Sequence, residues 1–308
     1  MAYVSVRGVQ HYVEWVSDRS SEDCLSATDA PVASADLRQP NPDKPVMVFI
    51  HGWGGSCRYW RHTAQQMADR YDCLLYDLRG FGRSRLPRPI PPAVEALGYA
   101  LEGYADDLDE LLTILGIETV SLNAHSAGAS IAAFFLNQYP QRTQQAILTC
   151  HGIFDYNALT FKLFHFVGQY VVAFRPAWFA RIPLADRMFV ARFLHRPIPP
   201  QDRQEFLEDF LMADYEAALG TLYTSVSKWA AEVMPEAYRS LTVPTLLLSG
   251  EYDQIIPVRL GVKAAVLSEQ VQHVVLPNTG HFPMLEDNHT YQATINHFLQ
   301  ETPLSAVS

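Results

Sequence analysis

The stretch Thr119-Val120-Ser121-Leu122-Asn123-Ala124-His125-Ser126-Ala127-Gly128-Ala129 predicts a short apolar strand that runs straight into a helix, with Ser126 at the corner. Small residues, Ala124 and Gly128, stand two positions on either side of this serine. A tight strand-to-helix turn needs small residues there, because a bulky side chain would collide with the neighbouring backbone. The turn would hold the hydroxyl above the helix N-terminus, where the Ala127 amide is free to donate to a developing negative charge. Ser126 is therefore a candidate nucleophile.

Length and composition suit a single α/β unit that carries an insertion. The chain has 308 residues, of which 48% are apolar, so it can bury a large core. Its formal net charge of −10 argues against general binding to nucleic acids and favours solubility.

The cysteines and the N-terminal residues bear on the cellular compartment. Cys24, Cys57, Cys73 and Cys150 are scattered and form no Cys-x-x-Cys pair, which favours reduced thiols over a disulfide framework or a zinc site. The first residues lack a signal-peptide pattern, and no run reaches the roughly 18 apolar residues of a membrane span. We therefore expect a cytoplasmic protein that uses neither a metal nor another cofactor.

After an N-terminal hairpin, strands and helices are expected to alternate. The hairpin comprises Tyr3–Val6 and His11–Val16, and residues 18–45 follow as a surface excursion rich in Ser, Asp, Ala and Pro. The expected strands are Val46–Ile50, Asp72–Leu78, the Val120 strand, Gln145–Cys150, Pro244–Ser249 and Val271–Leu276. The expected helices lie near 57–70, at about 101–115, at 129–139 and around Tyr291, Ile295, Phe298 and Leu299. This alternation predicts an α/β fold, with a mostly parallel sheet, helices on both faces, and ligands at the carboxyl ends of the strands.

The helix at 101–115 shows the clearest two-faced pattern. One face should be buried and carries Tyr104, Leu108, Leu111, Leu112 and Leu115. The opposite face should be exposed and carries Asp106, Asp107, Asp109 and Glu110.

A glycine-rich loop follows the first strand of the alternating region. The sequence there is His51-Gly52-Trp53-Gly54-Gly55. Glycines allow backbone amides to point inward, so the amide of Trp53 is the natural second oxyanion donor beside that of Ala127.

Two further chemical groups follow later strands. Gly250-Glu251-Tyr252-Asp253 comes directly after the strand at 244–249, and a carboxylate there can orient a histidine; Asp253 is the preferred acid and Glu251 its near rival. His281 lies in a loop that precedes a helix and is free to reach the end of another strand.

The remaining histidines are expected in other roles. His125 should face away from the serine hydroxyl, His51 should brace its own loop, and His151 should lie near the site without acting as the base. The surface or helix-cap histidines are His165, His195, His273, His289 and His297.

With these motifs the chain resembles the α/β-hydrolase fold superfamily, in its serine-nucleophile, capped branch. The resemblance rests on five segments in one order, namely His51-Gly52-Trp53-Gly54, Asp77-Leu78-Arg79-Gly80-Phe81-Gly82-Arg83-Ser84, Ala124-His125-Ser126-Ala127-Gly128, Gly250-Glu251-Tyr252-Asp253 and Gly280-His281. Ala124 departs from the family, which most often has glycine there.

The resemblance implies the roles of individual residues. Ser126, Asp253 and His281 would form the catalytic triad, and the amides of Trp53 and Ala127 would form the oxyanion hole. Asp77 and the residues from 79 to 84 would brace the loop beside the site. Asp155 is the alternative triad acid, because some members of the family place the acid just after the preceding strand.

This chemistry predicts an enzyme that cleaves a carboxylic ester or thioester of a fairly large apolar substrate through an acyl-enzyme. The same triad also serves C–C bond hydrolysis, cofactor-free haloperoxidation and acyl transfer, and receptors that retain a triad are a further alternative. Because the predicted nucleophile is serine and not aspartate, the dehalogenase and epoxide-hydrolase branches are disfavoured.

The insertion at residues 153–240 is expected to form a helical cap on a core made of residues 1–152 and 241–308. Its aromatic residues Phe161, Phe164, Phe174 and Trp178 are candidate substrate contacts. Basic residues dominate its first half and acidic residues dominate 201–218. One interpretation is an ordinary cap with buried aromatics. The other is an apolar pocket with a basic rim that makes peripheral contact with an anionic membrane.

Overall fold

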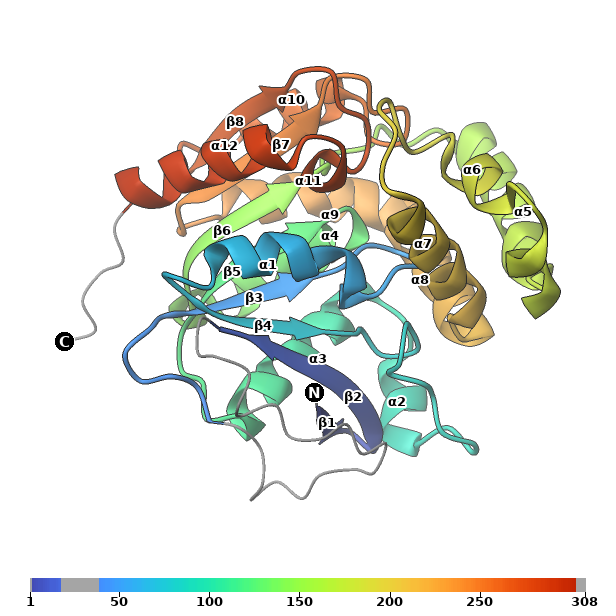
Figure 1. Cartoon of the computed structure of the whole chain (residues 1–308), viewed down its shortest axis with the longest axis horizontal. Coiled ribbons are helices and arrows are strands. Elements are labelled where there is room, and N and C mark those ends of the chain that lie inside the picture. The colour runs from blue at the N-terminus through green and yellow to red at the C-terminus, as the bar shows by residue number, and fades with distance from the viewer. Residues whose placement is uncertain (1, 18–38, 303–308) are drawn as a thin grey trace.

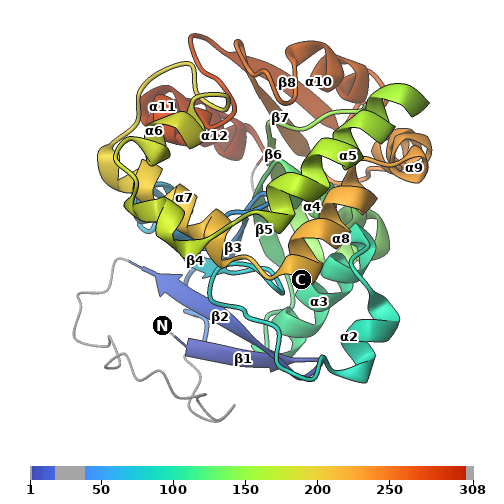
Figure 2. The same ribbon diagram turned by 90° about the vertical axis from the view of Figure 1, so that its right-hand side faces the viewer.

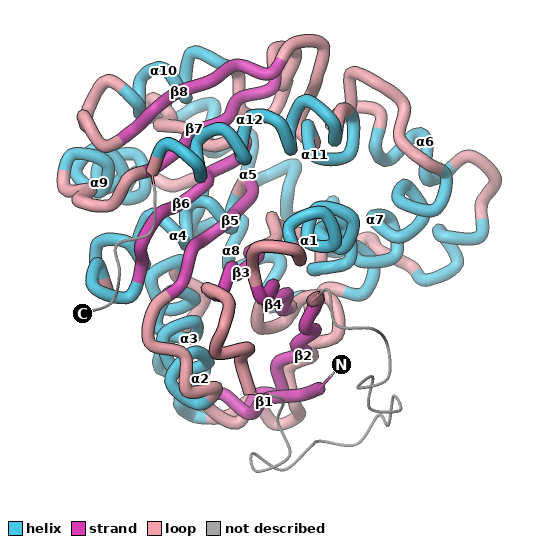
Figure 3. Tube along the Cα trace, turned by 60° about the vertical axis from the view of Figure 1, so that its left-hand side comes forward, coloured by secondary structure: helices cyan, strands magenta, loops and turns pink. Residues whose placement is uncertain are grey.

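The computed structural model describes residues 2–17 and 39–302, so most of the surface excursion expected at 18–45 lies outside the described residues. Eight strands form one sheet in the order β1-β2-β4-β3-β5-β6-β7-β8 (Figures 1 and 3). The strands are β1 (Ala2–Val6), β2 (Val9–Val16), β3 (Val46–Ile50), β4 (Asp72–Tyr76), β5 (Val120–His125), β6 (Thr143–Thr149), β7 (Thr245–Gly250) and β8 (Val271–Leu276). The predicted α/β fold is confirmed.

The first two strands differ from the others in direction. β1 pairs antiparallel with β2, and β2 pairs antiparallel with β4, which confirms the predicted hairpin. The pairs β3–β4, β3–β5, β5–β6, β6–β7 and β7–β8 are all parallel. Their carboxyl ends therefore meet at one edge of the sheet, where the chemical groups predicted after β3, β5, β7 and β8 can approach one another.

Helices cover both faces of the sheet. In the core they are α1 (Arg61–Met67), α2 (Pro92–Leu97), α3 (Leu101–Ile114), α4 (Ala127–Gln138), α10 (Val258–Ala265), α11 (Pro283–Glu286) and α12 (Asn288–Glu301). Side chains of β3 alternate between the two layers: Met47 and Phe49 pack with residues of α1 and α12, whereas Val48 and Ile50 pack with residues of α3 and α4. This alternation follows from the two-residue period of a strand.

Helix α3 corrects one prediction. Its leucine stripe is buried as expected, but Asp107 is buried too and accepts a hydrogen bond from Arg79 Nε at 2.7 Å. Position 107 lies three residues after Tyr104 and four before Leu111, both of which are buried, so helical spacing places it on the inner face. Arg7 also contacts Asp107, which supplies a second charge to compensate the buried carboxylate.

The segment between β6 and β7 forms five helices: α5 (Ala158–Ala173), α6 (Ala185–Val190), α7 (Pro200–Met212), α8 (Tyr215–Ser225) and α9 (Lys228–Arg239). A short 3-10 helix, η5 (Ala177–Arg181), connects α5 to α6. In Figure 1, α5 to α8 project beyond the carboxyl edge of the sheet, at the right of the view. Helix α9 instead packs against α4 and α10. Among residues 2–17 and 39–302, no helix has both the length and the apolar character needed to span a bilayer.

The start of α4 packs directly on the end of β3, which gives a test of this junction. A Cβ atom added at Gly128 would lie 2.4 Å from the carbonyl oxygen of His51 and 2.7 Å from that of Ile50. We predict that Gly128→Ala lowers the free energy of unfolding by about 1–3 kcal/mol, because backbone atoms must move apart. Urea denaturation measures this change.

Gly103→Ala, in α3, is the matched control. There the added Cβ would meet only the half-buried side chain of Leu97, which can change its rotamer. If both variants lower the free energy of unfolding equally, the close approach of α4 to β3 does not explain the destabilisation by Gly128→Ala.

Candidate active site

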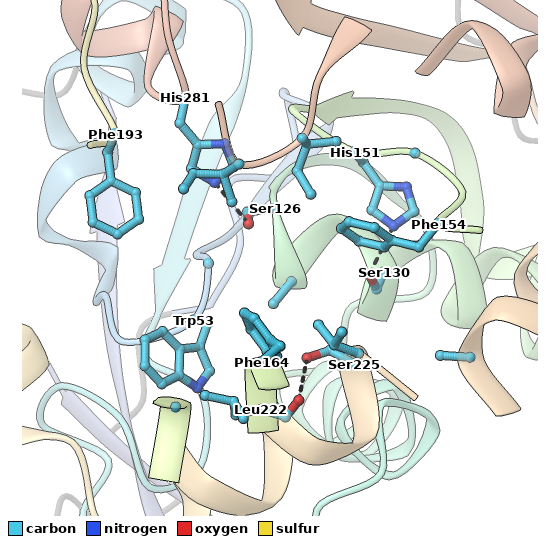
Figure 4. Close-up of a pocket in the computed structure, with 18 of the residues that line it drawn as sticks. Trp53, Ser126, Ser130, His151, Phe154, Phe164, Phe193, Leu222, Ser225 and His281 are labelled. Carbon is cyan, nitrogen blue, oxygen red and sulfur yellow. Dashed lines mark hydrogen bonds between the residues drawn. The ribbon is translucent and has the colours of Figure 1, made fainter. Parts of the chain in front are cut away.

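Ser126 occupies a strained turn between β5 and α4. Its backbone has φ 54° and ψ −121°, a conformation that costs a non-glycine residue about 1–3 kcal/mol. Its amide donates to Thr149 O at 2.9 Å, and its carbonyl accepts from the Ala129 and Ser130 amides at 2.9 and 3.2 Å. These bonds fix the turn, so the hydroxyl projects from the carboxyl edge of the sheet into a cavity (Figure 4).

Three side chains predicted from distant segments meet at this turn. His281 Nε2 lies 3.0 Å from Ser126 Oγ, and His281 Nδ1 lies 2.7 Å from Asp253 Oδ2. A carboxylate can only accept, so Nδ1 carries the proton and Nε2 is left to accept the serine proton. The side chains of His281 and Asp253 are 4% and 0% exposed, which shields both hydrogen bonds from water.

The two rival acids lie elsewhere. Asp253 Oδ1 accepts hydrogen bonds from the amides of Ile255 and Ile256 at 2.7 and 2.9 Å, so its second oxygen is aimed at His281. Asp155 is exposed and pairs with Lys263 instead of His281. Glu251 is also exposed and accepts from the Asn278 amide at 2.8 Å. The local turn after β7 therefore decides which acid reaches the histidine.

The His281 loop is held by a buried carboxylate that the sequence analysis did not identify. Glu286 accepts hydrogen bonds from the amides of Gly280 and Phe282 in this loop and from those of His195 and Arg196 in the cap segment. The His281 amide also donates to the Phe193 carbonyl at 2.7 Å. The candidate base is thus attached to residues between α6 and α7. No sequence motif marks Glu286, because its partners are backbone groups.

His125 holds the same loop from beneath. Its Nε2 donates to the carbonyl oxygen of His281 at 2.7 Å, and its Nδ1 lies 3.1 Å from the hydroxyl of Tyr59. Tyr59 in turn accepts from the Gly52 amide at 2.6 Å. Burial, with a smaller contribution from His281, lowers the pKa of His125 well below its ordinary value, so the ring is neutral. His125 therefore forms no hydrogen bond to the serine hydroxyl and links the glycine loop to the candidate base.

The two backbone amides predicted as oxyanion donors belong to segments beside Ser126. Ala127 is the first residue of α4, and its amide has no intrahelical partner. Trp53 follows Gly52, where an added Cβ would lie 3.2 Å from Ser126 Cβ. Within the described residues, neither amide donates to another hydrogen-bond acceptor. The indole of Trp53 donates to Ala218 O at 2.8 Å, which fixes the loop against α8.

His51 braces its own loop, as expected from the sequence, and the segment after β4 supports the same loop, as the resemblance implied. His51 Nδ1 lies 2.8 Å from Gly52 O, and its Nε2 accepts from the Leu78 amide at 2.9 Å. Asp77 binds the Cys57 amide at 2.8 Å and the guanidinium of Arg83 at 2.7 Å, and Arg83 lowers the pKa of this buried carboxyl. None of these side chains lines the cavity.

A cavity of about 460 Å³ lies between the cap and the carboxyl edge of the sheet, and Ser126 and His281 open into it. Its wall is mainly apolar and includes Phe161, Phe164, Val167, Val171, Leu222 and Met234. Two of the four aromatic residues predicted as substrate contacts, Phe161 and Phe164, therefore line it. Phe174 and Trp178 are not among its lining residues; they lie at the end of α5 and in η5 and are 71% and 55% exposed.

Polar side chains also line the cavity, and two of them are hydrogen-bonded to each other. His151 lines the cavity with Ser130; its Nε2 lies 2.8 Å from Ser130 Oγ and its Nδ1 lies 2.5 Å from Tyr238 Oη (Figure 4). Burial lowers the pKa of His151 to about 4, so the ring is neutral at pH 7. The expected position near the site is thus observed, and the ring contacts neither Ser126 nor Asp253.

In the described part of the chain, His125, Cys150 and His281 bring potential metal-ligand atoms within 4.8 Å of one another. Both histidines use their two ring nitrogens in the hydrogen bonds given above. Burial raises the pKa of the Cys150 thiol well above its ordinary value, which disfavours the thiolate that binds metals. The cluster is therefore explained by the hydrogen bonding around the candidate base.

Comparison with known proteins identifies the family. The profile of the α/β hydrolase fold family matches residues 45–288. The chain therefore belongs to the α/β hydrolase fold family. Relatives include an uncharacterised protein of Mycobacterium tuberculosis, 26% identical over 84% of this chain and 76% of that protein. Another relative is epoxide hydrolase 3 of Xenopus tropicalis, 25% identical over 88% of this chain and 74% of that protein.

Solved structures agree with this assignment. A thermophilic esterase from Thermogutta terrifontis superposes with a TM-score of 0.72, covering 98% of this chain and 97% of that chain at 20% identity. At this level of identity the likeness supports the fold alone. The relatives thus include proteins named for two different hydrolytic reactions, and the choice between them depends on the chemistry of the site.

The buried His151 ring predicts a specific dependence of stability on pH. Its folded-state pKa of about 4 is below the ordinary value of 6.5, so the unfolded chain binds a proton in this range that the folded chain does not. Stability contributed by the neutral ring is complete above pH 6.5 and is lost as the pH falls toward 4, by roughly 3 kcal/mol in total. We predict that the free energy of unfolding falls by roughly 3 kcal/mol less between pH 6.5 and 4 in His151→Gln than in the parent protein. Urea denaturation at the two pH values measures this difference.

His297→Gln serves as the control, because His297 is an exposed histidine on α12. The free energy of unfolding of this control should depend on pH in the same way as that of the parent protein. A His151→Gln variant whose stability falls in parallel with that of the parent would contradict the buried, neutral ring.

Proposed function

We propose that this protein is a serine hydrolase that cleaves a carboxylic ester or thioester of a fairly large apolar substrate through an acyl-enzyme. The observation that carries the proposal is the chain of hydrogen bonds from Ser126 Oγ to His281 and on to Asp253, located where an apolar cavity meets the carboxyl edge of the sheet. This geometry is what a serine needs in order to become a nucleophile.

The first step forms the acyl-enzyme. His281 Nε2 accepts the proton of Ser126 as the oxygen attacks the substrate carbonyl carbon, and the carbonyl oxygen becomes an oxyanion. Asp253 holds the imidazole in the required tautomer and stabilises the imidazolium. The amides of Trp53 and Ala127 stabilise the oxyanion, and one such donor is worth roughly 3 kcal/mol in comparable sites. His281 then gives its proton to the leaving alcohol or thiol, and the carbonyl re-forms as an ester of Ser126.

The second step returns the enzyme to its starting state. Water enters the position vacated by the leaving group, and His281 removes a proton from it as it attacks the acyl carbon. The same two amides stabilise the second oxyanion. Collapse of this intermediate releases the carboxylic acid, and Ser126 recovers its proton from His281.

The nucleophile argues against epoxide hydrolysis, despite the relative named for it. Serine attack on an epoxide would leave a stable ether on the enzyme, which the water step above could not cleave. A carboxylate nucleophile would instead leave an ester. Because a serine stands at the turn after β5, acyl transfer to water fits the site better.

The cavity supports an apolar acyl or alcohol group. Its volume of about 460 Å³ is within the usual range for small-molecule sites, and its wall is largely aliphatic and aromatic. Polar side chains also line the wall: His151 and Ser130, which are hydrogen-bonded to each other, and Thr160, Arg192, Ser225, Ser227 and Gln254. The preferred substrate is therefore long or bulky, mostly apolar, and polar at the scissile bond.

The first test is chemical labelling combined with turnover. A fluorophosphonate probe should label the parent protein, and Ser126→Ala should abolish labelling and lower ester hydrolysis by at least about 10⁴-fold, because the nucleophile is lost. Mass spectrometry locates the label, and circular dichroism checks the fold.

Ser130→Ala is the matched control, because Ser130 is a second cavity serine that is hydrogen-bonded to a histidine; it should still be labelled. Full turnover by Ser126→Ala would refute the proposal. Labelling of Ser126 without turnover of any nitrophenyl ester would favour the alternatives that share the triad, namely C–C bond hydrolysis, haloperoxidation, acyl transfer to an alcohol, or a binding protein.

A second prediction concerns the size of the substrate. Ala231 lies on α9 and lines the cavity, so a larger side chain there removes space. We predict that Ala231→Phe shifts the optimum of kcat/KM toward shorter acyl chains in a nitrophenyl ester series. Glu232→Phe adds the same ring to the next residue, which is exposed and outside the cavity, and should leave the optimum unchanged. Equal optima in both variants would mean that the acyl chain does not occupy this cavity.

A further inference from the structure

Helix α5 is apolar on all sides and yet largely exposed. Over sixteen residues it carries one charged side chain, Lys162, and only Phe161, Gly168 and Val172 are buried. The buried stripe packs against α8, where Gly168 allows Leu222 to approach closely. Helices that are apolar all round are normally enclosed by protein or lipid. The described residues cover only one stripe of α5.

The uncovered side of α5 forms a continuous apolar row. Residues at helical spacing point outward there and are 79, 61, 56, 59 and 71% exposed; they are Leu159, Leu163, Phe166, Tyr170 and Phe174. The connection through η5 to α6 adds four more exposed apolar side chains, Trp178, Ile182, Leu184 and Met188. We call these nine residues the outer cap face. In Figure 2 the cap is turned toward the viewer and α5 crosses it in front of the sheet.

Basic side chains accompany the outer cap face. Lys162, Arg181 and Arg187 are exposed, and within the described residues no carboxylate oxygen lies within 4.0 Å of their side-chain nitrogens. From 161 to 200 the sequence has six Lys or Arg residues against one acidic residue, although the whole chain has a net charge of −10. The positive charge is therefore local to the apolar surface.

The acidic half of the cap is used differently. Asp209 and Glu208 on α7 form ion pairs with Arg58 of the core, and Asp214 pairs with Arg85. These contacts attach α7 and the start of α8 to the core. These acidic residues thus face the core, whereas the basic and apolar outer cap face is exposed, an arrangement complementary to an anionic lipid surface.

A second copy of the chain fits this face less well. In a twofold dimer the same patch meets itself, so the basic side chains of one copy would face a surface that carries the Lys162, Arg181 and Arg187 of the other. A bilayer offers acyl chains for Leu and Phe side chains, an interfacial zone for Trp178 and Tyr170, and phosphate groups for the cations.

The side of α5 between the outer cap face and the stripe packed on α8 faces the cavity. Thr160, Phe164, Val167 and Val171 line the cavity, while residues one or more positions away along the helix belong to the outer cap face. One helix therefore separates the bound-substrate space from the exposed surface. A protein that docks through this surface would bring its cavity next to lipid.

We propose that the outer cap face docks onto the surface of an anionic lipid bilayer, with its apolar side chains in the interface and Lys162, Arg181 and Arg187 at the headgroups. This contact goes beyond the proposed hydrolysis. Docking needs no turnover, so it can be tested on the Ser126→Ala protein, and the failure of one proposal leaves the other intact.

The experiment is vesicle flotation with the full chain. Vesicles of phosphatidylcholine alone are compared with vesicles in which one third of the lipid is phosphatidylserine. We expect binding to the anionic vesicles to exceed binding to the neutral ones by at least tenfold, and to decrease as salt is added.

Two triple variants separate the contributions of charge and apolar surface. Lys162→Gln/Arg181→Gln/Arg187→Gln should weaken binding to anionic vesicles by tenfold or more, since each charge is worth about fivefold near such a surface. Phe166→Ser/Tyr170→Ser/Phe174→Ser should weaken binding to both kinds of vesicle. Lys228→Gln/Arg239→Gln on α9 removes exposed charges away from this face and should change nothing.

Circular dichroism checks that the variants are folded. The same variants made in protein that retains Ser126 should also react with the fluorophosphonate probe and hydrolyse a short soluble ester. Absence of binding, equal binding to both vesicle types, or full binding by either triple variant would overturn the proposal. The parent protein could instead fail to bind vesicles and form a dimer in light scattering that the apolar triple variant does not form. That result would assign the outer cap face to contact with a second copy of the chain.

Discussion

The close approach of α4 to the end of β3 is the constraint on which the site depends. Gly128 has no side chain, so the first turn of α4 rests on the carbonyl groups of Ile50 and His51. This contact supports the left-handed backbone of Ser126, a conformation that an isolated chain would avoid. The same contact places the glycine loop after β3 beside the serine. One junction therefore positions the candidate nucleophile and the loop that carries an oxyanion donor.

The candidate base is coupled to the cap more closely than its place in the sequence suggests. Glu286 accepts amide hydrogens from both the His281 loop and the cap segment at 195–196, and Phe193 accepts the His281 amide. A displacement of this segment would therefore be transmitted to the imidazole. The cap therefore encloses an apolar cavity and also holds the candidate base His281 in position.

Charge is distributed unevenly between the two sides of the cap. Ion pairs from Arg58 and Arg85 fasten its acidic helices to the core. Within the described residues, the segment that carries the exposed apolar residues forms no ion pair with the core and is held mainly through the packing of α5 on α8 and of α6 on α7. The part of the cap with the weakest polar attachment is thus the part that also forms the outer wall of the cavity.

The sequence alone predicted the α/β class, the strand order along the chain, and the candidates Ser126 and His281, because these depend on local periodicity and on residues that end strands. It favoured Asp253 as the acid but left Glu251 and Asp155 as rivals. It placed Asp107 on the exposed face of its helix, although this residue is buried, since burial on a helix depends on what packs against it. It could not find Glu286, whose partners are backbone amides from two distant segments. Such contacts carry no sequence pattern, and only the tertiary structure decided them.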